Sequence, residues 1–225
     1  MDHGGDGLNW DQIAHSIEPS TDLSEMIFKV AGGPFGSKLH RVHGTKAMTQ
    51  TDPKAVVTIR VYDAADHAGV VALFTRINRE LAPEDLRERF EAYIAASLAG
   101  ELSRIGAVFS AAKRNAFWVV TAEDQIIGMF GLESRGPETT ELRRMYLDQP
   151  YRGRGIAQRM LACAESRARD LGFTTMILST AEIQSAALAF YRKHAYRLVR
   201  TERAEEMSTK TVGGGLTRFH FEKTL

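Results

Sequence analysis

The sequence predicts a mixed α/β domain that begins near residue 56 and runs to residue 225. Short segments with the two-residue alternation of strands are interspersed with longer segments that carry apolar residues at helical spacing. Such an order is typical of a sheet covered by helices. Residues 1–55 differ, because they are rich in Gly, Ser, Thr, Asp and His and lack sustained periodicity. We expect them to form an N-terminal extension that is loosely ordered or weakly helical.

The composition is that of a globular protein without a strong charge bias. Hydrophobic residues make up 44%, charged residues 25%, and the formal net charge is +1. We therefore expect neither nucleic acid nor membrane as a partner; no apolar run approaches the roughly 20 residues that cross a bilayer. The single cysteine, Cys163, excludes an intramolecular disulfide and a cysteine-rich zinc site, and the seven histidines lack metal-ligand spacing. The expectation is a cytoplasmic protein without a bound metal.

The first part of the domain predicts a strand, helices and then two strands. Residues 56–62 alternate and are rich in β-branched side chains, which predicts the first strand. Residues 68–81 carry apolar side chains at helical spacing. Pro83 and the acids after it open a second helical region. Residues 117–121 and 126–133 predict two strands joined by a turn.

The second part continues the alternation. Strand patterns occur at residues 142–147, 174–179, 196–202 and 216–222, and helical patterns at 156–171 and 184–194. The first of these strands alternates imperfectly, since Leu142, Met145 and Leu147 are unevenly spaced. Gly172 stands where a helix C-terminal stop belongs. The glycines at 213–215 predict a hairpin loop rather than a phosphate loop, because no helix follows them.

The segment from Glu141 to Leu161 carries the strongest functional signal. A strand ends, a basic glycine-rich turn follows, and an amphipathic helix begins at once. The first turn of a helix has N–H groups without an intrahelical acceptor, and its dipole adds partial positive charge. Gly153 and Gly155 allow the backbone to approach an anion, and Arg152 and Arg154 add full charges. Together these features predict a binding site for a pyrophosphate.

Basic charge is concentrated around this turn, because residues 141–169 contain seven arginines and three acids. For Arg143 and Arg144 two interpretations are open: they face solvent, or they steer an anionic cofactor. A P-loop is excluded because Gly-Lys followed by Ser or Thr is missing. A dinucleotide fingerprint is excluded because Gln158 stands where a small residue is needed.

The remaining pattern resembles the Arg/Gln-x-x-Gly-x-Gly/Ala signature of the GNAT acetyltransferase superfamily, with Arg152, Gly155 and Ala157 at the signature positions. Further along, Gln184-x-x-Ala187-x-x-Phe190-Tyr191 is similar to the Asn-x-x-Ala-x-x-Phe-Tyr of the family. Order and spacing agree over roughly residues 57–225. Two departures are the glutamine in place of asparagine, which alters a contact to the cofactor, and Ala195 in place of glycine, which changes how the helix ends.

The resemblance implies the GNAT fold: a central, mixed and mostly antiparallel sheet of about six or seven strands, flanked by about four helices. It implies that the strands at 142–147 and 174–179 splay apart to bind acetyl-coenzyme A or another acyl-coenzyme A. Backbone near Met145 and Leu147 would pair with the pantetheine arm, and N–H groups from Gly153 to Ala157 would take the pyrophosphate. The implied cofactor-binding residues are Met145, Tyr146, Leu147, Arg152, Gly153, Arg154, Gly155, Ile156, Ala157, Gln184 and Ala187.

The resemblance also implies an N-acetyltransferase in which a primary amine attacks the thioester directly. Tyr191 matches the family tyrosine near the thioester sulfur and is assigned as general acid. Glu141 is the candidate base, Glu133 is the alternative, and a water chain without a dedicated base stays open. Cys163 is expected to be a small packing residue rather than a nucleophile. His194 is expected to cap a helix.

Two other functions stay open: a non-catalytic acyl-coenzyme A-binding module, and an N-terminal extension that docks a partner. The acceptor is a small-molecule or peptide amine that the sequence does not specify, and a homodimer is open because the family often dimerises. Glu80, Glu84 and Asp85 would suit a cationic amine, although acids in the first turn of a helix need no such explanation. For Tyr93 and Phe130, core packing is favoured over a place in the acceptor pocket.

Overall fold

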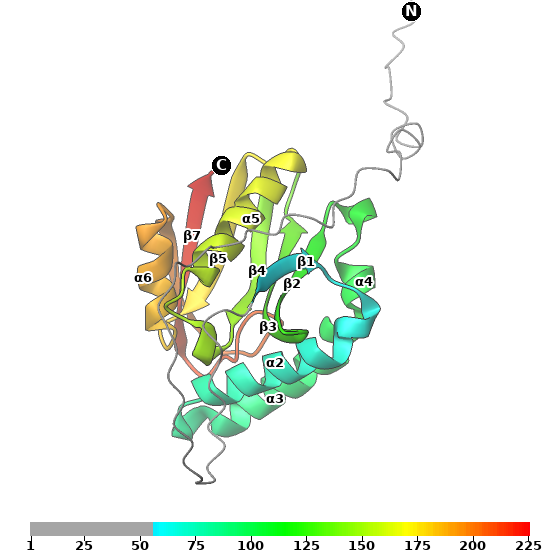
Figure 1. Cartoon of the computed structure of the whole chain (residues 1–225). Helices are drawn as coiled ribbons and strands as arrows, with labels where there is room; N and C mark the ends of the chain where they lie inside the picture. Colours follow the sequence, from blue (N-terminus) through cyan, green and yellow to red (C-terminus); the bar gives the residue numbers. More distant parts are fainter. Residues whose placement is uncertain (1–55) are drawn as a thin grey trace, which may run out of the picture. The chain divides into compact units, whose positions relative to one another are not determined.

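The computed structural model describes residues 56–225, so the prediction for residues 1–55 lies outside the described part of the chain. The described residues form a seven-stranded sheet with the order β1-β2-β3-β4-β5-β7-β6 (Figure 1). The strands are β1 (Val57–Val61), β2 (Ala116–Ala122), β3 (Gln125–Ser134), β4 (Thr139–Leu147), β5 (Thr175–Ala181), β6 (Arg197–Ala204) and β7 (Leu216–Thr224). All neighbouring pairs are antiparallel except β4 and β5, which are parallel. The predicted mixed, mostly antiparallel sheet is confirmed.

Helices cover both faces of this sheet. They are α2 (His67–Leu81), α3 (Arg87–Ala99), the single turn α4 (Ile105–Val108), α5 (Ile156–Asp170) and α6 (Ser185–Lys193). Apolar side chains of α2, α3 and α4 share one buried cluster, and those of α5 and α6 share another. Figure 1 shows α2 and α3 side by side. None of the helices in residues 56–225 combines the length and apolarity that a bilayer crossing requires.

The two clusters meet across the central strands. In β2, Phe117 and Val119 point into the cluster beneath α2 and α3, whereas Trp118 and Val120 point into the cluster beneath α5. Successive side chains of a strand face opposite ways, so a strand buried on both sides is apolar at every position. This burial explains why residues 117–120, within the strand predicted at 117–121, are all apolar.

Strand β4 carries one more residue than the stretch of β3 that it faces. Met129 pairs with Tyr146, but Gly131 pairs with Arg143, so the register shifts between them. The backbone of Arg144 adopts the left-handed region, with φ of 54°. This β-bulge brings Leu142 and Met145 to the same face of the sheet despite their spacing of three. It therefore explains the imperfect alternation of the sequence here.

The bulge directs Arg143 and Arg144 into the protein, so of the two interpretations left open for them, exposure to solvent is wrong. Arg143 donates to one oxygen of Glu101 at 2.7 Å and also to Glu133. Arg144 donates to the other oxygen of Glu101 at 2.9 Å and to the Tyr93 hydroxyl at 3.0 Å. Their side chains are 7% and 3% exposed. Carboxylates therefore neutralise two of the seven arginines that concentrate positive charge in residues 141–169.

Strands β4 and β5 are paired only where they begin. Their partners are Thr139 with Thr175, Thr140 with Met176, and Glu141 with Ile177. Beyond these pairs β4 continues along β3, and β5 continues along β7. The two strands splay apart after Glu141, as the family resemblance implied.

We expect the buried contacts of Arg144 in the bulge to stabilise the fold. Arg144→Met leaves Glu101 with one cationic partner and removes the hydrogen bond to Tyr93, so we expect the free energy of unfolding in urea to fall by about 3 kcal/mol. The matched control is Arg79→Met, which breaks an exposed ion pair with Glu91 and should leave the stability nearly unchanged. Equal losses in the two variants would contradict a special role for Arg144.

Candidate active site

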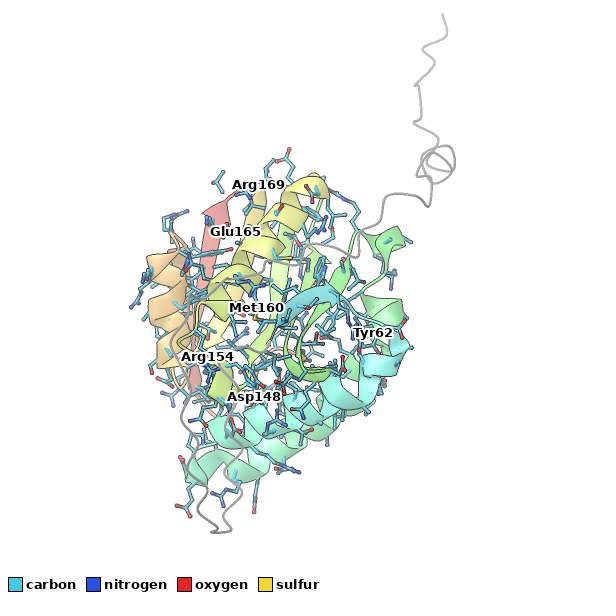
Figure 2. All side chains as sticks on the ribbon, in the orientation of Figure 1. Tyr62, Asp148, Arg154, Met160, Glu165 and Arg169 are labelled. Carbon is cyan, nitrogen blue, oxygen red and sulfur yellow. The ribbon has the colours of Figure 1, made fainter. Side chains whose placement is uncertain are left out.

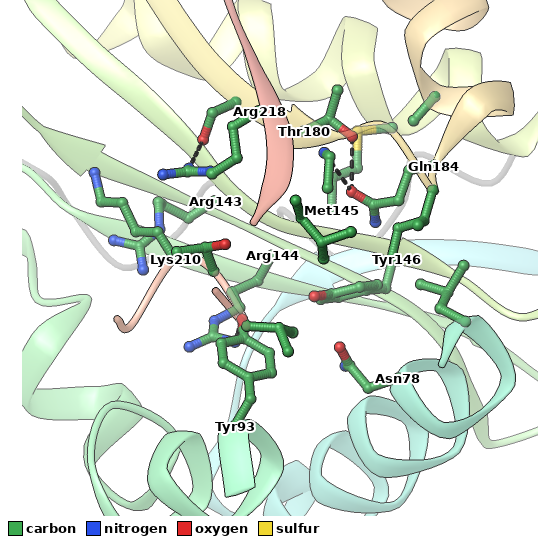
Figure 3. Close-up of a pocket in the computed structure, with 18 of the residues that line it drawn as sticks. Asn78, Tyr93, Arg143, Arg144, Met145, Tyr146, Thr180, Gln184, Lys210 and Arg218 are labelled. Carbon is green, nitrogen blue, oxygen red and sulfur yellow. Dashed lines mark hydrogen bonds between the residues drawn. The ribbon is translucent and has the colours of Figure 1, made fainter. Parts of the chain in front are cut away.

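A pocket opens where β4 and β5 splay apart (Figure 3). Its walls come from β4, β5 and β7, from α2, α3 and α6, and from the loop that joins β6 to β7. Six of the residues predicted from the sequence line it together: Glu141, Met145, Tyr146, Gln184, Ala187 and Tyr191. The other predicted residues are Leu147 at the end of β4, residues 152–155 in the turn after it, and Ile156 and Ala157 at the start of α5.

Tyr191 lies in the wall of the pocket on α6. Its hydroxyl is 3.7 Å from the Sδ atom of Met145, and the residue is 7% exposed. Burial raises the pKa of Tyr191 above its ordinary value. The phenol therefore keeps its proton at neutral pH and can donate it, or a hydrogen bond, to an anion that forms in the pocket.

Gln184 joins the end of β5 to the start of α6. Its Oε1 atom accepts hydrogen bonds from the Thr180 hydroxyl at 2.7 Å and from the Ala181 N–H at 3.2 Å. A backbone N–H can only donate, so the atom that it meets is the carbonyl oxygen of the amide. Gln184 lines the pocket, and its amide NH₂ can donate hydrogen bonds to a ligand there.

The turn before α5 is exposed and shaped by two glycines. Gly153 and Gly155 have φ of 74° and 76°, in the left-handed region that favours glycine. Gly155 precedes the first helical residue, and its carbonyl accepts from the N–H of Arg159 at 3.1 Å. The N–H groups of Ile156 and its neighbours come before this first helical bond, so they have no intrahelical acceptor. This helix end suits an anion.

Arg152 and Arg154 flank the same turn. The Nε atom of Arg152 donates to the Leu147 carbonyl at 2.9 Å, which ties the turn to the end of β4. The guanidinium of Arg154 lies 5.7 Å from the ring centre of Tyr151. Figure 2 shows Arg154 near the start of α5, with Met160 further along the helix. The side chains of Leu147 and Ile156 are buried in the core, so their backbone is the part that can meet a ligand.

Glu141 is a buried carboxylate held by cations. It accepts from the Nε atom of Arg135 at 2.6 Å and from the Nζ atom of Lys210, and it is 4% exposed. Burial alone would raise the pKa of Glu141, but the hydrogen bond from Lys210 and the nearby arginines outweigh it and lower that pKa. The alternative carboxylate, Glu133, is bound by Arg135 and Arg143. The lowered pKa keeps Glu141 anionic at neutral pH.

Sequence analysis missed two further cations in the pocket. Lys210 comes from the loop between β6 and β7, and Arg218 lies on β7 with 7% of its surface exposed. Arg218 is two residues beyond the buried Leu216, so a charge on the buried face of an alternating strand was a usable signal. Lys210 had no such signal, because nothing in a loop sequence specifies which side chains turn inward.

Other expectations have mixed outcomes. Tyr93 both packs in the core and lines the pocket, whereas Phe130 is a core residue stacked on Trp118. Glu84 and Asp85 are exposed in the first turn of a short helix. Glu141 is the one acid among the described residues that line the pocket, so the three acids considered for a cationic amine are not part of it.

The structural assignments of Cys163 and His194 are confirmed. Cys163 packs against the core, where burial raises its pKa, and this disfavours a thiolate. His194 is the C-terminal capping residue of α6, with Nδ1 2.8 Å from the Phe190 carbonyl oxygen. The next residue, Ala195, has φ of 65°, a conformation that glycine adopts more readily. Ala195 therefore holds the left-handed conformation that glycine usually supplies at the end of a helix.

Comparisons with known proteins point the same way. The model of the acetyltransferase (GNAT) family matches residues 70–196. N-acetyltransferase 8 of Homo sapiens is 29% identical over 110 residues, which are 47% of this chain and 48% of that protein. N-acetylaspartate synthetase of Danio rerio is 29% identical over 108 residues, which are 48% of this chain and 38% of that protein. The chain thus spans about half the length of these curated relatives, or less.

Solved structures share the fold. An acetyltransferase of the GNAT family from Staphylococcus aureus Mu50 has a TM-score of 0.58 at 15% identity, over 75% of this chain and 99% of that chain. The PaiA N-acetyltransferase of Thermoplasma acidophilum, in complex with coenzyme A, has a TM-score of 0.57 at 19% identity, over the same shares.

We expect the left-handed backbone of Gly155 to make this position sensitive to a side chain. Gly155→Ala places a Cβ in open space but in a strained conformation, so we expect the free energy of unfolding to fall by roughly 1 kcal/mol. Gly106→Ala is the matched control, because it also meets open space but lies in helix α4, where alanine is the better residue. A loss of the same size at Gly106 in thermal or urea unfolding would contradict the argument from backbone conformation.

Proposed function

Because the chain belongs to the GNAT acetyltransferase family, we propose that it transfers an acetyl group from acetyl-coenzyme A to a primary amine. One observation carries the proposal: the opening between β4 and β5 lies directly before an exposed glycine turn and the N-terminus of α5. A thioester on a long arm that ends in a pyrophosphate needs these two features next to each other. The first offers unpaired strand backbone, and the second offers an anion site.

In the proposed complex, the backbone of Met145 and Leu147 pairs with the amides of the pantetheine arm. The N–H groups from Gly153 to Ala157 bind the pyrophosphate, and Arg152 and Arg154 add positive charge. The amide NH₂ of Gln184 contacts the same arm from the opposite wall, beside Ala187, and Tyr146 lines its path. The coenzyme A found in the T. acidophilum relative of similar fold supports this choice of cofactor.

In the proposed reaction the neutral amine attacks the thioester carbonyl, so a C–N bond forms as the C–S bond breaks. Tyr191 donates a proton to the leaving thiolate, which is supported by its buried, protonated hydroxyl in the pocket wall. The amine loses its proton through water toward Glu141. The cationic partners of Glu141 lower its pKa, so it is a weak base. It assists mainly by electrostatic attraction of the proton that leaves the amine.

Calorimetric titration of acetyl-coenzyme A into the full chain tests the proposed pyrophosphate site at residues 152–157. We expect micromolar binding and a loss of about tenfold or more in affinity for the double variant Arg152→Ala, Arg154→Ala. The double variant Arg167→Ala, Arg169→Ala removes the same charge from the far end of the same helix and should bind nearly as wild type does. A folded protein that binds no acyl-coenzyme A would contradict the proposed function.

Replacement of the proposed acid separates an enzyme from a binding module. Tyr191→Phe should lower kcat about 100-fold and leave the affinity for acetyl-coenzyme A within about twofold. Tyr62→Phe removes a hydroxyl from a tyrosine outside the pocket and should change neither quantity. Unchanged kcat in Tyr191→Phe would rule this residue out as the acid. Tight binding without turnover of any amine would favour the non-catalytic module.

A further inference from the structure

Positive charge dominates the pocket wall that β7 and the β6–β7 loop help to form (Figure 3). The basic residues that line it are Arg143, Arg144, Lys210 and Arg218. Among the described residues, one acid, Glu141, lines the pocket with them. Since the chain as a whole is nearly neutral, this excess is a local property of the pocket.

Two of the four cations are committed to structure. Arg143 is bound by Glu101 and Glu133. Arg144 has Glu101, the Tyr93 hydroxyl and the Thr209 carbonyl as acceptors, and its guanidinium lies 4.9 Å from the ring centre of Phe74. These contacts hold the bulge of β4, so neither side chain is placed for a ligand.

The other two cations make fewer contacts within the protein: Lys210 is bound by Glu141, and Arg218 by Glu202 and Ser179. Lys210 shares Glu141 with Arg135. Arg218 donates to Glu202 at 3.1 Å, and that carboxylate also binds Arg200 at 2.8 Å. Each of these carboxylates also serves at least one other basic side chain, and the side chain of Arg218 is only 8% exposed. Burial lowers the pKa of Lys210 and of Arg218, as expected where a buried charge lacks a full counter-charge.

We propose that Lys210 and Arg218 bind a carboxylate of the acceptor, so that the acceptor is an amine with its own carboxylate, such as a free amino acid. This inference rests on the proposed acetyl transfer. A guanidinium presents a planar fork that matches a carboxylate. Ser179 and Glu202 hold that fork in place, and Arg218 is the register partner of Ala181, at the splayed end of β5.

The test compares matched acceptors with the full chain and acetyl-coenzyme A, with thiol release as the readout. The panel contains the free amino acids, their primary amides and the corresponding amines without the carboxyl group. We expect kcat/KM for the best free amino acid to exceed that of its amide about tenfold or more, because a charge-assisted pair is lost in the amide.

Variants assign this preference to the two cations. Arg218→Gln should lower kcat/KM for the free acid about tenfold or more and change the value for the amide little. Lys210→Gln, in a loop and with a side chain that is 31% exposed, should act in the same direction and serves if Arg218→Gln fails to fold. Arg200→Gln removes a partner of the same Glu202 from the surface, so it should retain the preference.

The outcomes separate the inference from the proposed function. Turnover of amides or simple amines as fast as of the free acids overturns the inference and leaves acetyl transfer intact. So does an equal loss for acid and amide in Arg218→Gln and Lys210→Gln. If acetyl-coenzyme A binds but no carboxylate-bearing amine is acetylated, the inference is likewise overturned. Failure to bind acetyl-coenzyme A would remove the proposed function and the inference with it.

Discussion

The short pairing between β4 and β5 is the constraint on which the rest of the structure depends. The two parallel strands share three residue pairs and then separate, while each keeps its antiparallel partner on the other side. Beyond Glu141 one edge of β4 has no strand beside it in the described part of the chain. Buried backbone groups require partners, so an opening in the middle of a sheet is a place for a ligand or for water.

The chain connection places the N-terminus of a helix beside that opening. Parallel neighbours cannot be joined by a hairpin and need a crossover, which α5 provides between β4 and β5. The helix begins at Ile156, nine residues after the last residue of β4, and Arg152 fastens the intervening turn to Leu147. Unpaired strand backbone and unpaired helix N–H groups are therefore neighbours because of topology. The two left-handed glycines shape the turn that joins them.

Local patterns were enough to predict the helices and strands and the glycine turn before α5. The α5 helix was predicted from residue 156 to 171 and is observed at Ile156–Asp170, because its apolar stripe and its final glycine are both local signals. The acceptor side was not predictable in this way. Arg143 and Arg144 turn inward because of a bulge, and their partner Glu101 lies more than forty residues away. Neither a register shift nor a long-range ion pair leaves a periodic trace in the sequence.

The charge arrangement of the pocket is difficult to explain by stability alone. Glu101, Glu133 and Glu141 together serve four buried or half-buried cations, Arg135, Arg143, Arg144 and Lys210, so these cations exceed the carboxylates that serve them. Well-packed apolar residues would often be at least as stable as such a network, because desolvation offsets much of the attraction. The excess also lies in the wall of the opening rather than in either apolar cluster. An excess of positive charge at one concave site is typical of a surface that binds a ligand of negative charge.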